Sequence, residues 1–182
     1  AGNVQQTYTI SSSPSRPLSI SVTVKAQSTS IGTRWMLDHL KPGMRIRAFG
    51  PNGIFSFHRH PAAKYLFISA GSGITPMMSM TTWAWDRAQD TDIVFVHAAQ
   101  RPSDIIFRDQ LEHYVARVPG LQLRLTVEQP EPFRVWHGYQ GRLNSLMLGL
   151  MAPDYLDREV FCCGPEPFMQ AVREMLISLG YD

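Results

Sequence analysis

Cysteine is scarce in this chain. Among 182 residues there are only two cysteines, Cys162 and Cys163, and they are neighbours. Two adjacent thiols make no disulfide framework, and they cannot by themselves complete a structural zinc site or an iron–sulfur cluster. The six histidines are scattered without metal-ligand spacing on a helix, so the sequence predicts no metal site and favours a reducing compartment.

Long apolar runs and an excess of one charge sign are also missing. No run approaches the roughly 18 residues of a membrane helix, and there is no signal-peptide pattern. We therefore expect a cytoplasmic protein without a membrane partner. The net charge of +2, with no basic block interleaved with aromatics, predicts no nucleic-acid partner. The composition, 44% hydrophobic and 18% charged, is that of a globular chain with a core.

One stretch, residues 65–76, organises the rest of the chain. Its apolar run from Leu66 to Ile68 is typical of a parallel strand buried on both faces. Gly71 and Gly73 then allow a sharp turn and a close ligand approach, and Pro76 suits the first turn of a following helix. A strand, a glycine turn and a helix N-terminus favour a bound pyrophosphate, although a plain tight turn fits the same residues.

Strand and helix patterns alternate after this stretch. Such alternation predicts an α/β fold with a parallel sheet, right-handed crossovers and a ligand at the carboxyl ends of the strands. The pattern predicts strands over 92–99, 121–127 and 159–163, and helices over 107–118, 144–151 and 165–179.

The first 61 residues have a different pattern. Alternation over 7–11 and 18–24 predicts antiparallel strands, the second with Leu18, Ile20, Val22 and Val24 on one face. Thr33 is the expected N-cap of a short helix over 34–40, and a further strand is expected over 44–49. So few strands cannot close a barrel, because open edges would remain.

Five motifs stand in a fixed order along the chain, the last two about 90 residues apart: Tyr8-Thr9-Ile10-Ser11, Gly32-Thr33, Gly50-Pro51-Asn52-Gly53, Gly71-Ser72-Gly73-Ile74-Thr75-Pro76 and Cys163-Gly164-Pro165. This set resembles the ferredoxin NADP reductase superfamily. The resemblance is closest to the FAD/NADH reductase components of bacterial Rieske-type oxygenases, such as those of glycine betaine monooxygenase, and to hybrid-cluster-protein reductases.

The resemblance implies two domains, both truncated. Residues 1–61 would be the second half of an antiparallel flavin-binding barrel. Residues 62–182 would be a Rossmann-like NAD(P)-binding domain lacking its last strand.

A flavin site is also implied by the resemblance. Tyr8 would pack on the isoalloxazine and Thr9 would bond it near N5. Val24 and Lys25 would lie along the dinucleotide, with Gly32 and Thr33 at its pyrophosphate. The family's phosphate-binding arginine is replaced here by Gln6, an uncharged donor.

The nicotinamide site is implied in the same way. Thr75 would hold the carboxamide, and Cys163 would lie beside C4, its thiol pKa lowered by a helix N-terminus. Cys162 would point into the core. The implied catalytic residues are Tyr8, Thr9, Thr75 and Cys163, and the nicotinamide-binding residues are Gly71, Ser72, Gly73, Ile74, Thr75, Pro76, Gln100, Arg101, Cys163, Gly164 and Pro165.

The function implied is that of an electron-transfer flavoprotein reductase. A hydride would pass from NAD(P)H to FAD, and single electrons would pass on to a [2Fe-2S] ferredoxin-type domain or protein supplying an oxygenase. NADH is favoured; Arg101 keeps NADPH open, or is a solvated loop residue. The alternative is a nucleotide-binding or interaction fragment that no longer holds flavin.

Overall fold

The computed structural model describes residues 5–26, 29–133 and 135–181. Its centre is a parallel sheet in the order β4-β3-β2-β1-β5. The predicted α/β fold and its parallel strands are confirmed. The strands are β1 (Lys64–Ala70), β2 (Asp92–Ala99), β3 (Leu121–Val127), β4 (Tyr139–Gln140) and β5 (Glu159–Cys163).

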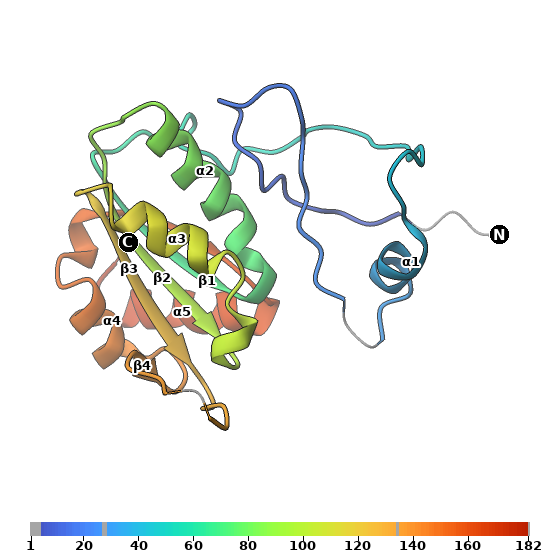
Figure 1. Cartoon of the computed structure of the whole chain (residues 1–182). Coiled ribbons are helices and arrows are strands. Elements are labelled where there is room, and N and C mark those ends of the chain that lie inside the picture. Colours follow the sequence, from blue (N-terminus) through green and yellow to red (C-terminus); the bar gives the residue numbers. More distant parts are fainter. Residues whose placement is uncertain (1–4, 27–28, 134, 182) are drawn as a thin grey trace.

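Helices cover both faces of the sheet (Figure 1). The α2–α3 face buries Phe67 and Phe95, and the α4–α5 face buries Leu66 and Val94. Because both faces are buried, the strands read as continuous apolar runs. The helices on one face are α2 (Ile74–Asp86) and α3 (Arg108–Val115), and those on the other are α4 (Ser145–Met151) and α5 (Glu166–Ser178).

Three short 3-10 turns complete this part: η1 (Gly71–Gly73), η2 (Pro102–Asp104) and η3 (Tyr155–Asp157). The predicted helix over 107–118 is shorter than expected, because Phe107 takes a left-handed φ of 60° and stands before the helix. The two-residue strand β4 was not predicted, since a strand that short has no readable alternation.

The N-terminal part contains one helix, α1 (Ile31–His39), and little else that is regular. The expected antiparallel pairing is reduced to a single bridge between Ile10 and Val22, and the strand predicted over 44–49 is wrong. Thr33 is not the N-cap; it lies inside α1, and the extended Ser30 precedes the helix.

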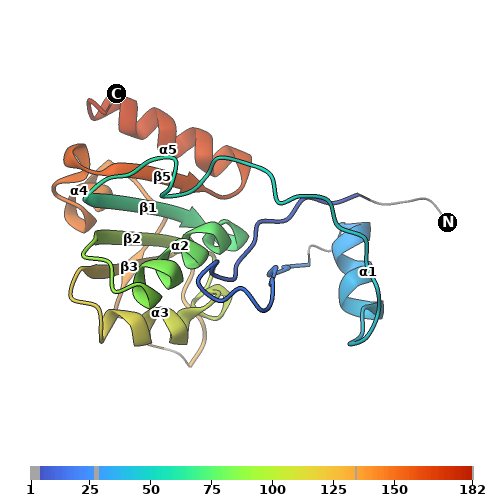
Figure 2. The ribbon, with the colours of Figure 1, turned by 90° about the horizontal axis from the view of Figure 1, so that it is seen from above.

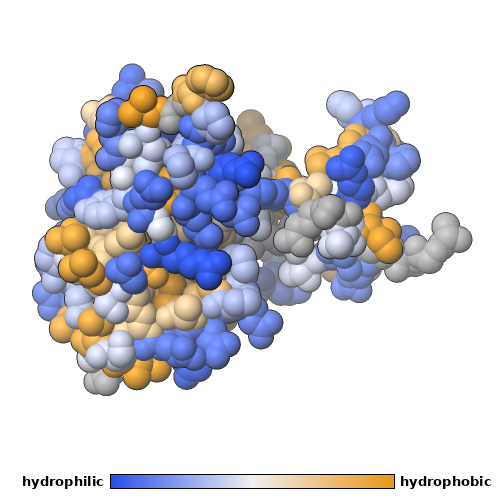
Figure 3. All heavy atoms as spheres, turned by 90° about the horizontal axis from the view of Figure 1, so that it is seen from below, coloured by the Kyte–Doolittle hydropathy of each residue, from blue (hydrophilic) through white to orange (hydrophobic). Residues whose placement is uncertain are grey.

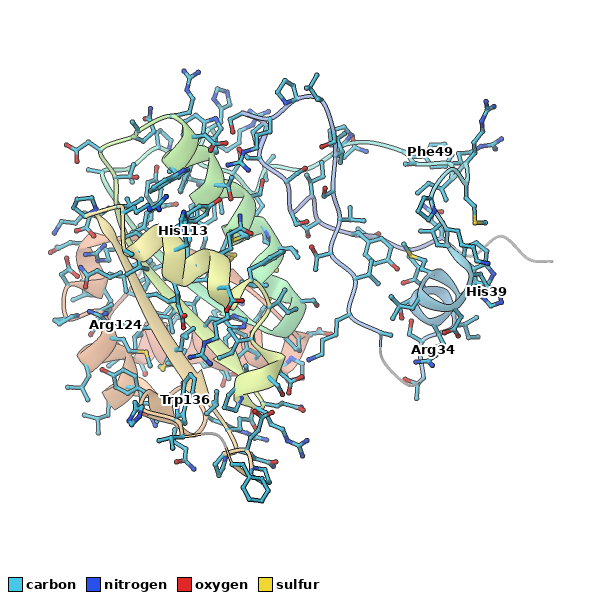
Figure 4. The ribbon with its side chains drawn as sticks, in the orientation of Figure 1. Arg34, His39, Phe49, His113, Arg124 and Trp136 are labelled. Atoms are coloured by element: carbon cyan, nitrogen blue, oxygen red, sulfur yellow. The ribbon has the colours of Figure 1, made fainter. Side chains whose placement is uncertain are left out.

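Apolar side chains of this part are strongly exposed. Leu18 and Ile20, expected on one face of a strand, are 100% and 72% exposed, and Phe49 is 82% exposed at the outer side of the smaller lobe (Figure 4). A strand is stable only when a neighbour fills its ladder and covers its face. The described residues supply neither, which explains the missing strands.

The two parts form a large and a small lobe (Figure 3). The arrowheads of β1 and β5 point toward the small lobe, so the carboxyl ends of the strands face it (Figure 2). Arg16 makes a bidentate ion pair with Asp86 at 2.7 and 2.8 Å, and the Ser79 hydroxyl donates to the Ser12 carbonyl at 2.7 Å. The N-terminal part is therefore tied to α2.

A buried arginine secures the opposite end of the sheet. Arg158, 4% exposed, donates to both carboxylate oxygens of Asp92 at 2.9 Å and to Asp154 at 2.7 and 3.0 Å. It also reaches the Tyr65 carbonyl at 3.2 Å. One guanidinium thus joins the beginnings of β1, β2 and β5. Its hydrogen bond to Asp154 is the main reason why the pKa of that carboxyl is lowered to about 2, with Lys64 adding to the effect.

This cluster predicts how acid destabilises the fold. The folded-state pKa of Asp154 lies below its ordinary value of 3.8. The contact of the Asp154 carboxylate with Arg158 therefore stabilises the fold fully above pH 3.8, and this stabilisation is lost as the pH falls toward 2. We expect Asp154→Asn to lower the free energy of unfolding by about 1 kcal/mol at neutral pH, since the carboxyl is partly exposed. Urea titrations between neutral pH and pH 2.5 should show this difference shrinking with acid. Asp90→Asn, in the exposed turn before β2, controls for removal of a charge; a difference for Asp154→Asn that is independent of pH would contradict the assignment.

Candidate nicotinamide and flavin site

The two glycine-containing motifs of the C-terminal part are in direct contact. A Cβ placed on Gly73 would lie 2.2 Å from the Cys163 carbonyl oxygen and 2.6 Å from the Gly164 nitrogen. In the sheet, Ser69 pairs with Cys163. Only a glycine lets these backbones come so close. The expected convergence of the two motifs on one edge of the sheet is confirmed.

The η1 turn shapes the near side of this contact. Gly71 has a φ of +53°, Ser72 is exposed, and Gly73 is buried against β5. The Thr75 hydroxyl, 4% exposed, donates to the Ser72 carbonyl at 3.0 Å, and Pro76 is buried in the first turn of α2 as predicted. The helix therefore begins at the rim, where the Ile74 N–H donates to the carbonyls of Gly71 and Ser72. The nicotinamide role of Thr75 stays a prediction.

The two cysteines point to opposite faces of β5. Cys162 packs with the α4–α5 core and Cys163 with the α2–α3 core. Burial, followed by the neighbouring Cys163, raises the pKa of Cys162 to about 12. Burial also raises the pKa of Cys163, and the Gly164 N–H opposes this only in part. The expected lowering at a helix N-terminus is therefore wrong, because desolvation outweighs the backbone donor; Cys163 is a neutral thiol that can lie against a ring.

The loops after β2 and β3 form the continuation of this rim. Gln100 and Arg101 are both exposed, and the Gln100 carbonyl accepts the Gln129 N–H at 2.9 Å. Beside them, Lys25 of the N-terminal part makes an ion pair with Asp104 at 2.9 Å. Residue 25, expected along the flavin dinucleotide, is thus placed at the nicotinamide domain.

The expected flavin residues lie on the small lobe. The hydroxyls of Tyr8 and Thr33 are buried and have no hydrogen-bond partner within the described residues. The Gln6 side chain lies over the first turn of α1, where a Cβ on Gly32 would be 2.9 Å from Gln6 Cγ. A buried hydroxyl left unpaired costs about 1–3 kcal/mol, so each of the two fits a polar ligand. Thr9 and Lys25 are exposed and Val24 is half-buried; the flavin roles of these residues stay predictions.

One polar pair at the rim was missed from the sequence. Ser69 and His97 are both fully buried, and the Ser69 hydroxyl lies 2.9 Å from His97 Nδ1. Burial, and then the positive charge of Lys25, lower the pKa of His97 to about 4, so the imidazole is neutral near pH 7. The available signal was a single histidine inside the apolar run 92–99.

The described residues contain neither a candidate membrane span nor a candidate metal cluster. No helix there is long and apolar enough to cross a membrane. No group of three or more His, Cys, Asp or Glu side chains there could hold a metal ion.

Comparison with known proteins identifies the C-terminal part. The oxidoreductase NAD-binding domain family matches residues 67–174, more than half of the chain. This chain belongs to that family. The match contains β1 from Phe67 onward, the glycine turn and the strand that ends at Cys163. The NAD-binding domain thus has its two rim motifs in contact, as described above.

Two curated proteins show how far the likeness extends. The chain is 63% identical to the stachydrine N-demethylase reductase subunit of Rhizobium meliloti, covering 100% of this chain and 51% of that protein. It is 46% identical to the glycine betaine monooxygenase reductase subunit of Pseudomonas aeruginosa, covering 98% of this chain and 49% of that protein. The chain therefore spans about half the length of the curated relatives it matches, and the resemblance to oxygenase reductase components is confirmed.

A solved structure shows the same fold. The flavohem-like FAD/NAD-binding domain of nitric oxide dioxygenase from Vibrio cholerae superposes with a TM-score of 0.78, at 22% identity. The superposition covers 96% of this chain and 72% of that one. The two chains thus share one fold over nearly the whole length of this chain.

The contact between Gly73 and Cys163 predicts that a single methyl group added at residue 73 lowers both stability and NAD⁺ affinity. We expect Gly73→Ala to lower the free energy of unfolding by about 2–3 kcal/mol, because the backbones must separate, and to weaken NAD⁺ binding with it. Gly149→Ala is the matched control, since nothing lies within 4 Å of its Cβ position in α4. Urea unfolding and NAD⁺ titration calorimetry measure both effects. Wild-type stability and affinity in Gly73→Ala would show that the backbones are not in contact.

Proposed function

We propose that this chain is part of an electron-transfer flavoprotein reductase that oxidises NADH. The observation that carries the proposal is the direct contact of Gly73 with the Cys163–Gly164 peptide, at the carboxyl ends of strands that point toward the small lobe (Figure 2). The small lobe holds the Tyr8 and Thr33 hydroxyls, which are buried without a hydrogen-bond partner among the described residues. When bound, the cofactors would supply the redox chemistry, a hydride leaving C4 of the nicotinamide for flavin N5.

The residues of the chain would orient the two rings. Cys163, a neutral thiol at the rim, would lie against the nicotinamide, and Thr75 would hold its carboxamide. Tyr8 and Thr9 would position the flavin. Since hydride transfer needs donor and acceptor about 3–3.5 Å apart, the main contribution of the protein is geometric.

We infer that residues 1–61 are the second half of a flavin-binding barrel and residues 62–182 the nicotinamide domain. The strong exposure of Leu18, Ile20 and Phe49 supports this division, because these side chains would be covered in a completed barrel. The relatives, about twice as long, have room for the remaining strands.

NADH is the favoured nucleotide. Three acidic residues, Asp104, Glu128 and Glu131, lie on the loops after β2 and β3, and the basic Arg101 is among them. Carboxylates repel a 2′-phosphate and can accept hydrogen bonds from a ribose hydroxyl. Lys25 and Arg142 pair with Asp104 and Glu128, so these two basic side chains are already engaged, and Arg101 by itself is a weak site for a 2′-phosphate. This supports NADH over NADPH.

The electron acceptor would be a [2Fe-2S] ferredoxin-type domain or protein that supplies an oxygenase. Support comes from the names of the relatives, which are reductase subunits of a demethylase and of a monooxygenase. The two unpaired thiols suit a reducing compartment, which we infer to be the cytoplasm.

A second candidate function is nucleotide binding without flavin. It is favoured by Gln6, which takes the place of a charged arginine, and by the open apolar surface of the small lobe. Such a fragment would bind NADH or a partner protein and remain colourless.

The visible spectrum separates the two functions. We expect the chain, purified with added FAD, to show oxidised-flavin bands that NADH bleaches without oxygen. Cys163→Ser should slow this bleaching by about tenfold or more, because the ring loses its support, while leaving the flavin bands unchanged. Cys162→Ala, on the other face of β5, is the control and should stay within about twofold of wild type. A colourless protein, or bound flavin untouched by both nicotinamides, would refute the reductase function.

The Gln6 position gives an independent test of the flavin site. We expect Gln6→Arg to tighten FAD binding by about tenfold, because a charge-assisted bond to phosphate replaces a neutral one. The gain should shrink as salt is raised. Gln5→Arg adds the same charge at an exposed neighbouring residue and serves as the control. Equal FAD affinities in the two variants, measured by fluorescence titration, would place the phosphate elsewhere.

A further inference from the structure

The buried imidazole of His97 has no evident role in stability. In register across β5, β1 and β2, the α2–α3 face carries a buried aromatic row, Phe161, Phe67 and Phe95. Two residues further toward the carboxyl ends, the same three strands carry Cys163, Ser69 and His97. The row nearest the rim is therefore polar. Its members Ser69 and His97 are nevertheless buried as deeply as the aromatic row.

A phenylalanine side chain would fill position 97 without burying a polar atom. His97 Nε2 is buried without a hydrogen-bond partner within the described residues, whereas a phenylalanine would leave no polar atom unpaired. What the imidazole does provide is Nδ1, 2.9 Å from the Ser69 hydroxyl; the alternative partner of that hydroxyl, the Val96 carbonyl, lies at 3.4 Å. The imidazole is thus the closer partner of Ser69.

Ser69 occupies the critical place in this row. It pairs with Cys163 in the sheet, and the chain after it enters the turn whose Gly73 touches the Cys163 carbonyl. That contact is so close that it leaves no room for a Cβ atom at residue 73. A small rotation of the end of β1 would therefore move the turn relative to β5, and with it Thr75 relative to Cys163.

We propose that His97 is a positioning residue of the nicotinamide site, acting through the Ser69 hydroxyl to fix the end of β1 beside Cys163. This inference rests on the proposed function, because it concerns the ring that Cys163 and Thr75 would hold. Burial keeps the imidazole neutral, so Nδ1 can pair with a hydroxyl without bringing a charge into the core. Among the charged groups nearby, Lys25 and its partner Asp104 lie on the rim side of the imidazole.

Four variants of the FAD-loaded chain test the proposal. His97→Phe removes both nitrogens and keeps a ring like that of Phe95. His97→Asn keeps a polar atom near the position of Nδ1. Ser69→Ala removes the partner, and the double variant His97→Phe with Ser69→Ala removes both. His113→Asn, at an exposed histidine of α3 (Figure 4), is the control.

The readout is anaerobic flavin reduction, separated into a limiting rate and an NADH dissociation constant. We expect His97→Phe and Ser69→Ala each to lower the limiting rate by about tenfold with an NADH dissociation constant within about threefold of wild type. His97→Asn should recover most of the rate, and the double variant should be no slower than either single one. A wild-type rate in His97→Phe, equal losses in His97→Phe and His97→Asn, or additive losses in the double variant would overturn the proposal.

A second measurement does not depend on turnover. Addition of NAD⁺ should shift the ¹⁵N resonances of the His97 imidazole in the wild type, and the shift should disappear in Ser69→Ala. If the flavin of the wild type is not reduced by NADH, the proposed function fails, and this titration still decides the role of His97. Resonances of His97 that ignore NAD⁺ would overturn it. Thermal unfolding of each variant identifies any that do not fold, in which case Ser69→Ala and His97→Asn carry the test.

Discussion

The approach of Gly73 to the Cys163–Gly164 peptide is the constraint on which the site depends. A side chain at residue 73 has no room, so the turn after β1 lies directly against the peptide that follows β5. Gly164 adds to this contact, since a Cβ there would meet Ala70 and Phe168. Two segments far apart in the sequence are therefore held in direct contact, which suits the site that we propose for a flat, precisely oriented ring.

The opposite end of the sheet holds the same strands in place. Arg158 joins the beginnings of β1, β2 and β5 through Asp92, Asp154 and the Tyr65 carbonyl. Between the two ends lie aromatic rings in contact, such as Phe67 with rings of neighbouring strands at 5.7 Å. The strands are thus fixed by charge at the amino end, by packing in the middle and by a glycine contact at the rim.

The small lobe depends on a different kind of contact. It is joined to the sheet by ion pairs, Arg16 with Asp86 and Lys25 with Asp104, and by Phe57, which is buried against Phe67 and Trp83. Leu18, Ile20 and Phe49 remain exposed. Surface ion pairs contribute little energy but fix orientation. This suits a lobe that presents one cofactor to another, and it agrees with relatives that are about twice as long.

The sequence predicted the elements whose stability is visible in a local pattern of residues, and it failed where an element depends on a distant neighbour. The strands over 92–99, 121–127 and 159–163 match the structure, because burial on both faces writes an apolar run into the chain itself. Thr33 as an N-cap and the strand over 44–49 failed. The helix begins at Ile31, after an extended Ser30 whose side chain makes no capping hydrogen bond, and the strand over 44–49 needed a neighbouring strand.

By itself the sequence determined the parallel sheet, its helices and the two motifs at the rim, since each rests on residues close together in the chain. Only the tertiary structure decided that Gly73 touches Cys163, that burial raises the pKa of that thiol, and that Ser69 pairs with the neutral His97. Those properties arise where separate strands meet and water is excluded, and no local pattern records which neighbours a buried group will have.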